Sequence, residues 1–139
     1  MITHNDLGRF GEKKAVEYLT AKGYAILERN WVCGHKEVDI IAKDEKTIVI
    51  VEVKTRKSSF LVAPEVTVDS FKQRNLIWAA NCYVRMKNLD NDVRFDIVSI
   101  VVDKTEKFIL DHLEDAFYPK IRWALISFEF FQKGKSIFL

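Results

Sequence analysis

Apolar residues recur along the chain with two different periods, and the period separates predicted helices from predicted strands. Between Asp6 and Lys22 they return every three or four positions, as on one face of an amphipathic helix, and Gly23 follows where helices commonly end. A longer stretch with the same period, over residues 68–87, predicts a second helix. These two helices frame a group of strands.

Alternation with a period of two predicts the strands. They are expected at 24–32, 37–43, 46–55, 94–102 and, more briefly, 107–110, with a short helix at 112–117. In the strand 37–43, the residues Val38, Ile40 and Ala42 are expected on the face opposite to Asp39 and Ile41.

The strand 46–55 is predicted to lie in the centre of a sheet. One face carries Ile48, Ile50, Glu52 and Lys54, and the opposite face carries Val49, Val51 and Val53. Apolar residues on both faces are typical of a strand that is covered on both sides. The order helix, three strands, helix, two strands predicts an α/β fold with a single mixed β-sheet flanked by helices.

Length and composition fit one globular domain. The chain has 139 residues, of which 48% are hydrophobic and 30% charged, so it can build one core. We expect a domain over residues 1–118 and an apolar C-terminal extension over 119–139. The formal net charge of +2 does not by itself indicate a nucleic-acid binder, but a basic groove can coexist with an acidic site that cancels it.

The cysteines, the N-terminal residues and the lack of a long apolar stretch predict a cytoplasmic protein. Cys33 and Cys82 have neither zinc-ligand spacing nor the pattern of a disulfide framework, so two reduced thiols are expected. The N-terminal residues lack the layout of a signal peptide, and no stretch reaches the roughly 18 apolar residues of a membrane span.

Glu12 is the first unusual feature. It lies three, four and seven positions before Ala15, Val16 and Leu19, so its side chain shares the apolar stripe of the first helix. Burying an unpaired carboxylate is costly, and such a group is usually paired, hydrogen-bonded or bound to a metal. We therefore expect Glu12 to face a polar partner at the sheet.

The second unusual feature is a pair of carboxylates on neighbouring strands. If Glu45 and Lys46 form a two-residue turn, Asp39 and Glu52 become direct cross-strand neighbours. Two like charges so placed are destabilising unless something positive lies between them. Mg²⁺, or Mn²⁺ in its place, suits such a pair, because hard cations prefer oxygen ligands.

Lys54 extends this pattern into a candidate catalytic site. It projects from the same face as Glu52, where its ammonium can stabilise charge on a phosphate, and Glu12 can orient a water. Metal-assisted hydrolysis of a phosphodiester is the chemistry that these residue types serve. The alternative is a salt-bridge ladder, but the two strands are otherwise rich in Ile and Val, where a solvated ladder is unusual.

Several ordered motifs resemble the YraN-like uncharacterised protein family over residues 7–117. The matching positions are Gly8, Gly11-Glu12, Ala15, Tyr18-Leu19, Gly23-Tyr24, Arg29-Asn30-Trp31, Glu37 to Ala42, Val51 to Arg56, Pro64, Val68, Lys72, Ala79, Tyr83 and Arg94-Phe95-Asp96. That family is similar to the restriction-endonuclease-like fold, the PD-(D/E)xK group, and especially to archaeal Holliday junction resolvases.

The resemblance implies roles for particular residues. In such nucleases a helix glutamate, a strand aspartate and a Glu-x-Lys motif bind metal and cleave DNA. Carried over one by one, these roles fall on Glu12, Asp39, Glu52 and Lys54, with Asp39 and Glu52 as the metal ligands.

Further residues are weaker candidates for contact with nucleic acid. Lys72 lies at the edge of the inner stripe of the second helix, from which its ammonium can reach a phosphate, and Gln73 follows it. Arg56 and Lys57 begin a polar loop just past the candidate metal strand, where backbone phosphates would lie. A solvated surface role is the alternative for each of them.

The C-terminal extension carries a strongly apolar stretch over residues 121–131. It is too short and too charged to span a membrane, so we expect it to be buried, against the domain or in a homodimer. The leading hypothesis for function is a Mg²⁺-dependent endonuclease acting on DNA, with branched or damaged DNA as candidate substrates. A non-catalytic nucleic-acid-binding module with a nuclease-like fold is the alternative, and an interaction protein using the C-terminal aromatic residues is the third.

Overall fold

A computed structural model describes residues 3–62 and 67–119. Its elements, in chain order, are α1 (His4–Ala21), β1 (Ala25–Cys33), β2 (Lys36–Asp44), β3 (Thr47–Lys57), α2 (Ser70–Met86), β4 (Val93–Val102) and β5 (Phe108–Phe117). Each helix starts at a side chain that accepts a backbone N–H, Thr3 for α1 and Asp69 for α2. Gly23 follows α1 with a φ of 99°, a conformation that glycine adopts without strain.

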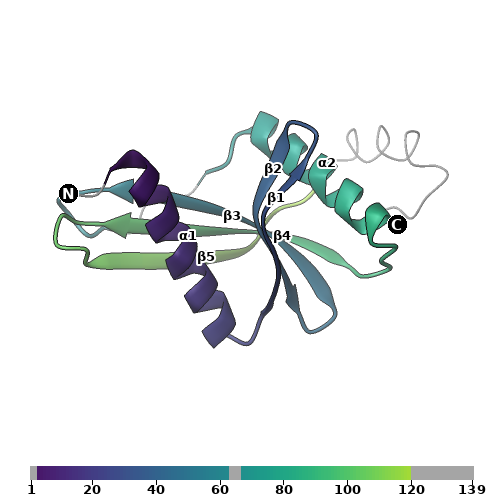
Figure 1. Ribbon diagram of the computed structural model, residues 1–139, viewed down its shortest axis with the longest axis horizontal. Coiled ribbons are helices and arrows are strands. Elements are labelled where there is room, and N and C mark those ends of the chain that lie inside the picture. Colours follow the sequence, from purple (N-terminus) through teal and green to yellow (C-terminus); the bar gives the residue numbers. More distant parts are fainter. Residues whose placement is uncertain (1–2, 63–66, 120–139) are drawn as a thin grey trace.

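The strands of the described ranges form one sheet in the order β1-β2-β3-β4-β5 (Figure 1). The pair β3–β4 is parallel, and the other three pairs are antiparallel. The parallel pair exists because α2 lies between β3 and β4 in the sequence and carries the chain back to the starting end of the sheet. The predicted α/β class and mixed sheet are confirmed.

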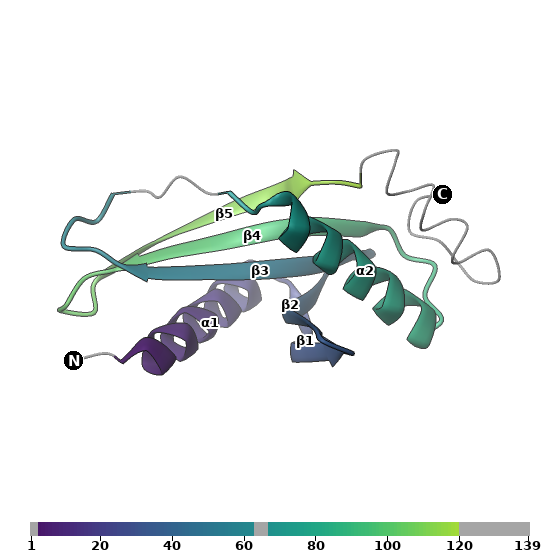
Figure 2. The same cartoon turned by 90° about the horizontal axis from the view of Figure 1, so that it is seen from above.

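The two helices cover opposite faces of the sheet, as Figure 2 shows. The core on the α1 face consists of Ala15, Leu19, Tyr24, Ile40, Ala42, Val49, Val51, Val98 and Ile100. The core on the α2 face consists of Val38, Ile41, Ile48, Ile50, Leu76, Ile77, Ala79, Ala80, Tyr83, Phe95 and Phe117. The even and odd residues of β3 therefore pack on different helices, as expected for a central strand that is covered on both sides.

The β1–β2 hairpin turns away from the other three strands (Figure 1). The ladder between β2 and β3 has the predicted register, from Asp44 opposite Thr47 to Ile40 opposite Val51, and ends there. After Val51, no residue of β3 pairs with β2 in this ladder. The C-terminal half of β3 consequently has an open edge.

One detail of β2 was predicted wrongly. Val38 packs on the α2 face, whereas Ile40 packs on the α1 face, so the two do not share a face. The neighbouring β1 has Asn30 in a left-handed conformation, with a φ of 51°, between the pairs Arg29–Ile40 and Trp31–Val38. The strand pair rotates at this point, and simple alternation is interrupted.

The short helix predicted at 112–117 is also wrong, because these residues belong to β5. The strand pairs with β4 over its length, with His112 opposite Val98 and Phe117 opposite Phe95. A shift in register beside Asp115, whose φ is 52°, interrupts the alternation of β5 and hides the strand from the sequence pattern. Cross-strand pairing outweighs the local preference of this polar stretch.

The two cysteines were expected as reduced thiols, and the structure instead pairs Cys33 with Cys82 in a disulfide. Residues 49 positions apart meet because the end of β1 lies against α2, where Trp31 also packs edge-to-face on Tyr83. Sequence spacing gave no sign of this contact.

The predicted extension 119–139 lies, apart from Pro119, outside the described residues, and so does the apolar stretch 121–131. Neither of the helices in the described part of the chain is long and apolar enough to cross a membrane.

Candidate functional site

The candidate site lies at the open edge of β3, where β2 separates from it. Asp39 and Glu52 would be the next pair of the β2–β3 ladder, and their side chains are hydrogen-bonded to each other. Asp39 Oδ2 also accepts a hydrogen bond from the backbone N–H of Val53 at 2.8 Å. The carboxylate thus occupies the place of a strand partner and holds the two diverging strands together.

Glu52 is a buried acid, with 6% of its surface exposed. Burial raises its pKa most, and the hydrogen bond and charge of Asp39 raise it further, to about 8, although the ammonium of Lys72 acts in the opposite direction. The Lys72 Nζ lies 3.2 Å from Glu52 Oε2. Burial and the neighbouring Asp39 thus favour the protonated form of Glu52, and in that form its carboxyl group can donate a hydrogen bond to Asp39.

Glu12 reaches this edge from α1, with its side chain 15% exposed. Its Oε1 accepts hydrogen bonds from Asn30 Nδ2 at 2.7 Å and from Arg29 Nε at 3.4 Å. Glu12 and Asp39 line one cavity of about 250 Å³. The side chain faces a polar partner at the sheet, as predicted, and that partner comes from β1.

A close contact between α1 and β3 fixes the position of Glu12. Gly11 is buried against Thr55, and a Cβ at this position would overlap the Thr55 hydroxyl. The absence of a side chain lets the helix lie directly on the strand, one residue before Glu12. Gly11 and Thr55 therefore bring a helix carboxylate within reach of the strand edge.

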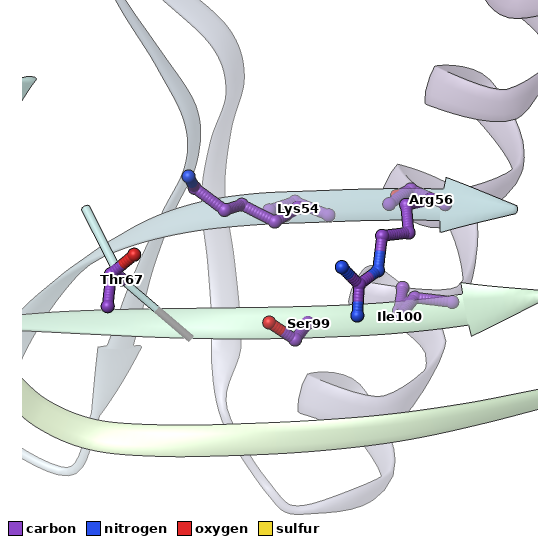
Figure 3. A pocket seen from close by; sticks show the side chains of 7 residues that line it. Lys54, Arg56, Thr67, Ser99 and Ile100 are labelled. Carbon is purple, nitrogen blue, oxygen red and sulfur yellow. The ribbon is translucent and has the colours of Figure 1, made fainter. Parts of the chain in front are cut away.

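Lys54 and Arg56 line a second cavity, of about 430 Å³, at the carboxyl ends of β3 and β4. Thr67 and Ser99 are further polar residues of its wall. In Figure 3, the Arg56 side chain extends from β3 over β4, whereas the Lys54 side chain runs along β3, away from Arg56. The structure thus places Lys54 beside the carboxylate pair along the strand but on a different cavity from Glu12.

The oxygen atoms of Asp39 and Glu52 fit a hard divalent cation. Within the described ranges, no three His, Cys, Asp or Glu side chains lie close enough to hold a metal on their own. Two carboxylates completed by water and a substrate phosphate are nevertheless a usual Mg²⁺ environment. The shared hydrogen bond shows the crowding of two acids that a cation would relieve.

The weaker candidates differ in what their side chains do. Lys72 contacts the site through Glu52 and remains 43% exposed. Gln73 donates its side-chain amide to the carbonyl of Val68 at 2.8 Å, so it supports the start of α2. Lys57 lies at the end of β3 and has interaction partners.

Sequence reasoning missed the residues that complete the site from other strands. Arg29 and Asn30, on β1, hold Glu12, while Ser99, on β4, faces Lys54 across the parallel pair. Arg29-Asn30 was visible as a motif, but its partner is 17 and 18 residues away and depends on the packing of α1.

A separate polar cluster lies where α1 and β5 meet β4. Asp96 is 1% exposed and accepts hydrogen bonds from Arg94 and His112. Lys22 bonds Glu114 at 2.6 Å and approaches the ring of His112 at 3.2 Å. Its members satisfy one another, which indicates a structural role for the cluster.

Comparison with known proteins gives a consistent family match. Residues 11–100 match the family described as "Uncharacterised protein family UPF0102". A UPF0102 protein from Parabacteroides distasonis is 48% identical over 122 residues, covering 88% of this chain and 100% of the relative. Another from Flavobacterium psychrophilum is 48% identical over 118 residues, covering 85% and 98%. A third, from Porphyromonas gingivalis, is 46% identical over 119 residues, covering 84% and 87%.

Proposed function

The chain belongs to the uncharacterised protein family UPF0102, and we propose that it is a metal-dependent endonuclease that hydrolyses phosphodiester bonds in DNA. The observation that carries the proposal is the pair Asp39–Glu52 at the open edge of a central strand. Carboxylates in contact destabilise a fold unless they share a proton or a cation. An acidic pair with basic residues beside it favours a site for metal and phosphate.

The metal would be held by Asp39 and Glu52. When bound, Mg²⁺ or Mn²⁺ would polarise the phosphate and lower the pKa of a coordinated water. Asp39 is fixed by the Val53 N–H, so its second oxygen keeps a defined direction. Lys72 compensates part of the negative charge of the pair and can turn from Glu52 to a substrate phosphate, since it is partly exposed.

Lys54 and Glu12 complete the proposed machinery. Lys54 is exposed on the same face of β3 as Glu52, and its ammonium can stabilise the charge that develops on the phosphate. Glu12 faces the cavity that it shares with Asp39, and Arg29 and Asn30 hold its carboxylate there. It is positioned to orient a water near the metal ligands.

A cleavage assay tests this proposal. The full chain, with Mn²⁺, is expected to cut at least one DNA among duplex, flap, four-way junction and single-stranded forms. Lys54→Ala should abolish cutting while most of the DNA affinity remains, because the lysine acts on the reacting phosphate. Lys46→Ala is the matched control, since Lys46 is an exposed lysine in the turn before β3. If wild type cuts none of these DNAs with Mg²⁺ or Mn²⁺, the nuclease proposal is wrong.

A nucleic-acid-binding module without catalysis is the second candidate. It is favoured by the engagement of Glu12 with Arg29 and Asn30, which leaves two carboxylates rather than three free to contribute to a metal site. In this case the protein binds the same DNAs with the same dependence on Arg56 and Lys72, and no metal leads to cutting. The cleavage assay therefore separates the two candidates.

A further inference from the structure

We propose that the cavity at the carboxyl ends of β3 and β4 binds a backbone phosphate of the nucleic-acid strand, adjacent to the phosphate that is cut. The identification of the ligand as a nucleic-acid strand rests on the proposed function. The anion preference rests on the cavity itself, which has a volume of about 430 Å³.

The residues that line the cavity have the chemistry of a phosphate site. Lys54 and Arg56 contribute two positive charges, Thr55, Thr67 and Ser99 are hydroxyl-bearing residues, and no carboxylate is among the lining residues. These side chains form no ion pair or side-chain hydrogen bond with the part of the chain that the structure describes. A guanidinium fork matches the oxygens of a phosphate in geometry as well as in charge.

The position in the sheet also favours a ligand. Lys54 on β3 lies opposite Ser99 on β4 in the parallel pair, so both project from one place on the α2 face. In open α/β sheets, ligands commonly bind outside the carboxyl ends of parallel strands. Ser99 is 3% exposed, so its hydroxyl forms the floor of the cavity rather than part of its rim.

The spacing along β3 relates this cavity to the candidate metal site. Glu52, Lys54 and Arg56 are every second residue of β3 and so share one face of the strand. Residues four apart on a strand are separated by about 13 Å. A nucleic-acid strand that runs along β3 would meet the carboxylate pair first, then Lys54, and then Arg56. Arg56 consequently holds a neighbouring phosphate and not the one at the metal ligands.

The salt dependence of DNA binding tests the proposal. A fluorescent single-stranded DNA is titrated with the full chain in EDTA, where no cutting occurs, at several salt concentrations. Arg56→Gln should weaken binding about tenfold and reduce the slope of log K against log salt by about 0.7, which corresponds to one lost phosphate contact on a single strand. Lys46→Gln, which removes one charge at the other end of β3, should leave the slope unchanged.

A second variant and a modified DNA make the test specific for a phosphate. Ser99→Val, which fills the floor of the cavity without a change of charge, should also weaken binding. A single neutral methylphosphonate linkage moved along the DNA should weaken wild-type binding most at one position, and Arg56→Gln should be insensitive at that position. Equal slopes for wild type and Arg56→Gln, or equal sensitivity to the neutral linkage, would overturn the proposal.

The outcome is independent of catalysis. If no DNA is cut but the slope changes as expected, the cavity is a phosphate site and the nuclease proposal fails. If DNA is cut and Arg56→Gln binds with the wild-type slope, the nuclease proposal stands and the phosphate site is wrong.

Discussion

Single residues decide how this sheet tolerates buried charge, and Asp96 is the clearest case. Its carboxylate is fully buried and accepts hydrogen bonds from His112 Nε2 at 2.7 Å and from Arg94 Nε and Nη2 at 2.9 Å each. The backbone N–H of Asp115 adds another at 3.0 Å. Burial alone would raise the pKa of Asp96, but these donors outweigh it and hold the pKa below its usual range.

Asp96→Asn should lower the free energy of unfolding by about 3 kcal/mol at pH 7, because it leaves buried donors without their charged partner. The pKa of Asp96 is depressed in the native state. The stabilisation by its ionised carboxylate is therefore present above the ordinary aspartate pKa and is lost as pH falls through the native pKa. Urea unfolding between neutral and acidic pH measures it, and the difference from wild type should shrink as pH falls below about 4.

Asp44→Asn is the matched control, since Asp44 binds the same Arg94 at 3.2 Å with its side chain 35% exposed. This substitution should lower the free energy of unfolding by less than about 1 kcal/mol, because exposed ion pairs contribute little to stability. Equal losses from the two substitutions would show that burial does not set the strength of these contacts.

The sequence predicted residue types at the site better than residue partners. Glu12, Asp39 and Glu52 were singled out because carboxylates on apolar faces are costly, and the structure brings Asp39 and Glu52 into contact. The partners of Glu12 were not predictable, because Arg29 and Asn30 reach it only through the packing of α1 against β1. The ring of His112 is buried against Asp96, a contact that depends on the pairing of β5 with β4.

At the scale of elements, the β2–β3 turn and β5 show where a sequence pattern succeeds and fails. The two-residue turn at Glu45 and Lys46 set the correct register, although Glu45 adopts a φ of 54° that favours other residues. Two strands on either side of a short turn have one register that buries their apolar faces. In β5, by contrast, the pairing depends on β4 and on an irregularity at Asp115, which local periodicity does not record.

The contact between α1 and β3 gives a prediction at this scale. Gly11→Ala should destabilise the protein by about 1–3 kcal/mol, because its Cβ would lie only 2.7 Å from Cβ of Thr55 and would overlap the hydroxyl. Thermal or chemical unfolding measures the loss. Since Glu12 is the next residue, the displaced helix should also reduce any cutting activity.

Gly8→Ala is the control in the same helix, because a Cβ at Gly8 would meet nothing within 4 Å. This substitution should stabilise the protein by about 0.5–1 kcal/mol, since alanine favours a helix over glycine. If Gly11→Ala were as stable as Gly8→Ala, the close approach of helix and strand would not be needed.

At the scale of the whole molecule, the carboxylate pair lies where two parts of the sheet diverge. Asp39 belongs to the β1–β2 hairpin and Glu52 to the group β3–β5, and the β2–β3 ladder ends one pair before them. The Asp39–Val53 hydrogen bond and the hydrogen bond between the Asp39 and Glu52 side chains hold the two parts together at this point. A cation bound by both carboxylates would take over this role with a stronger interaction.

Metal binding is therefore expected to stabilise the whole fold. A ligand that binds only the native state adds about 2.7 kcal/mol at a concentration one hundred times its Kd, which corresponds to a rise in melting temperature of roughly 5–10 °C for a chain of this size. Mg²⁺ and Mn²⁺ should produce this rise in wild type, and EDTA should reverse it.

Asp39→Asn should bind no metal in titration calorimetry and show no rise, whereas Glu17→Gln, which removes an exposed carboxylate of α1, should behave as wild type. A metal-dependent rise that survives in Asp39→Asn would place the cation elsewhere and remove the carboxylate pair from the catalytic proposal.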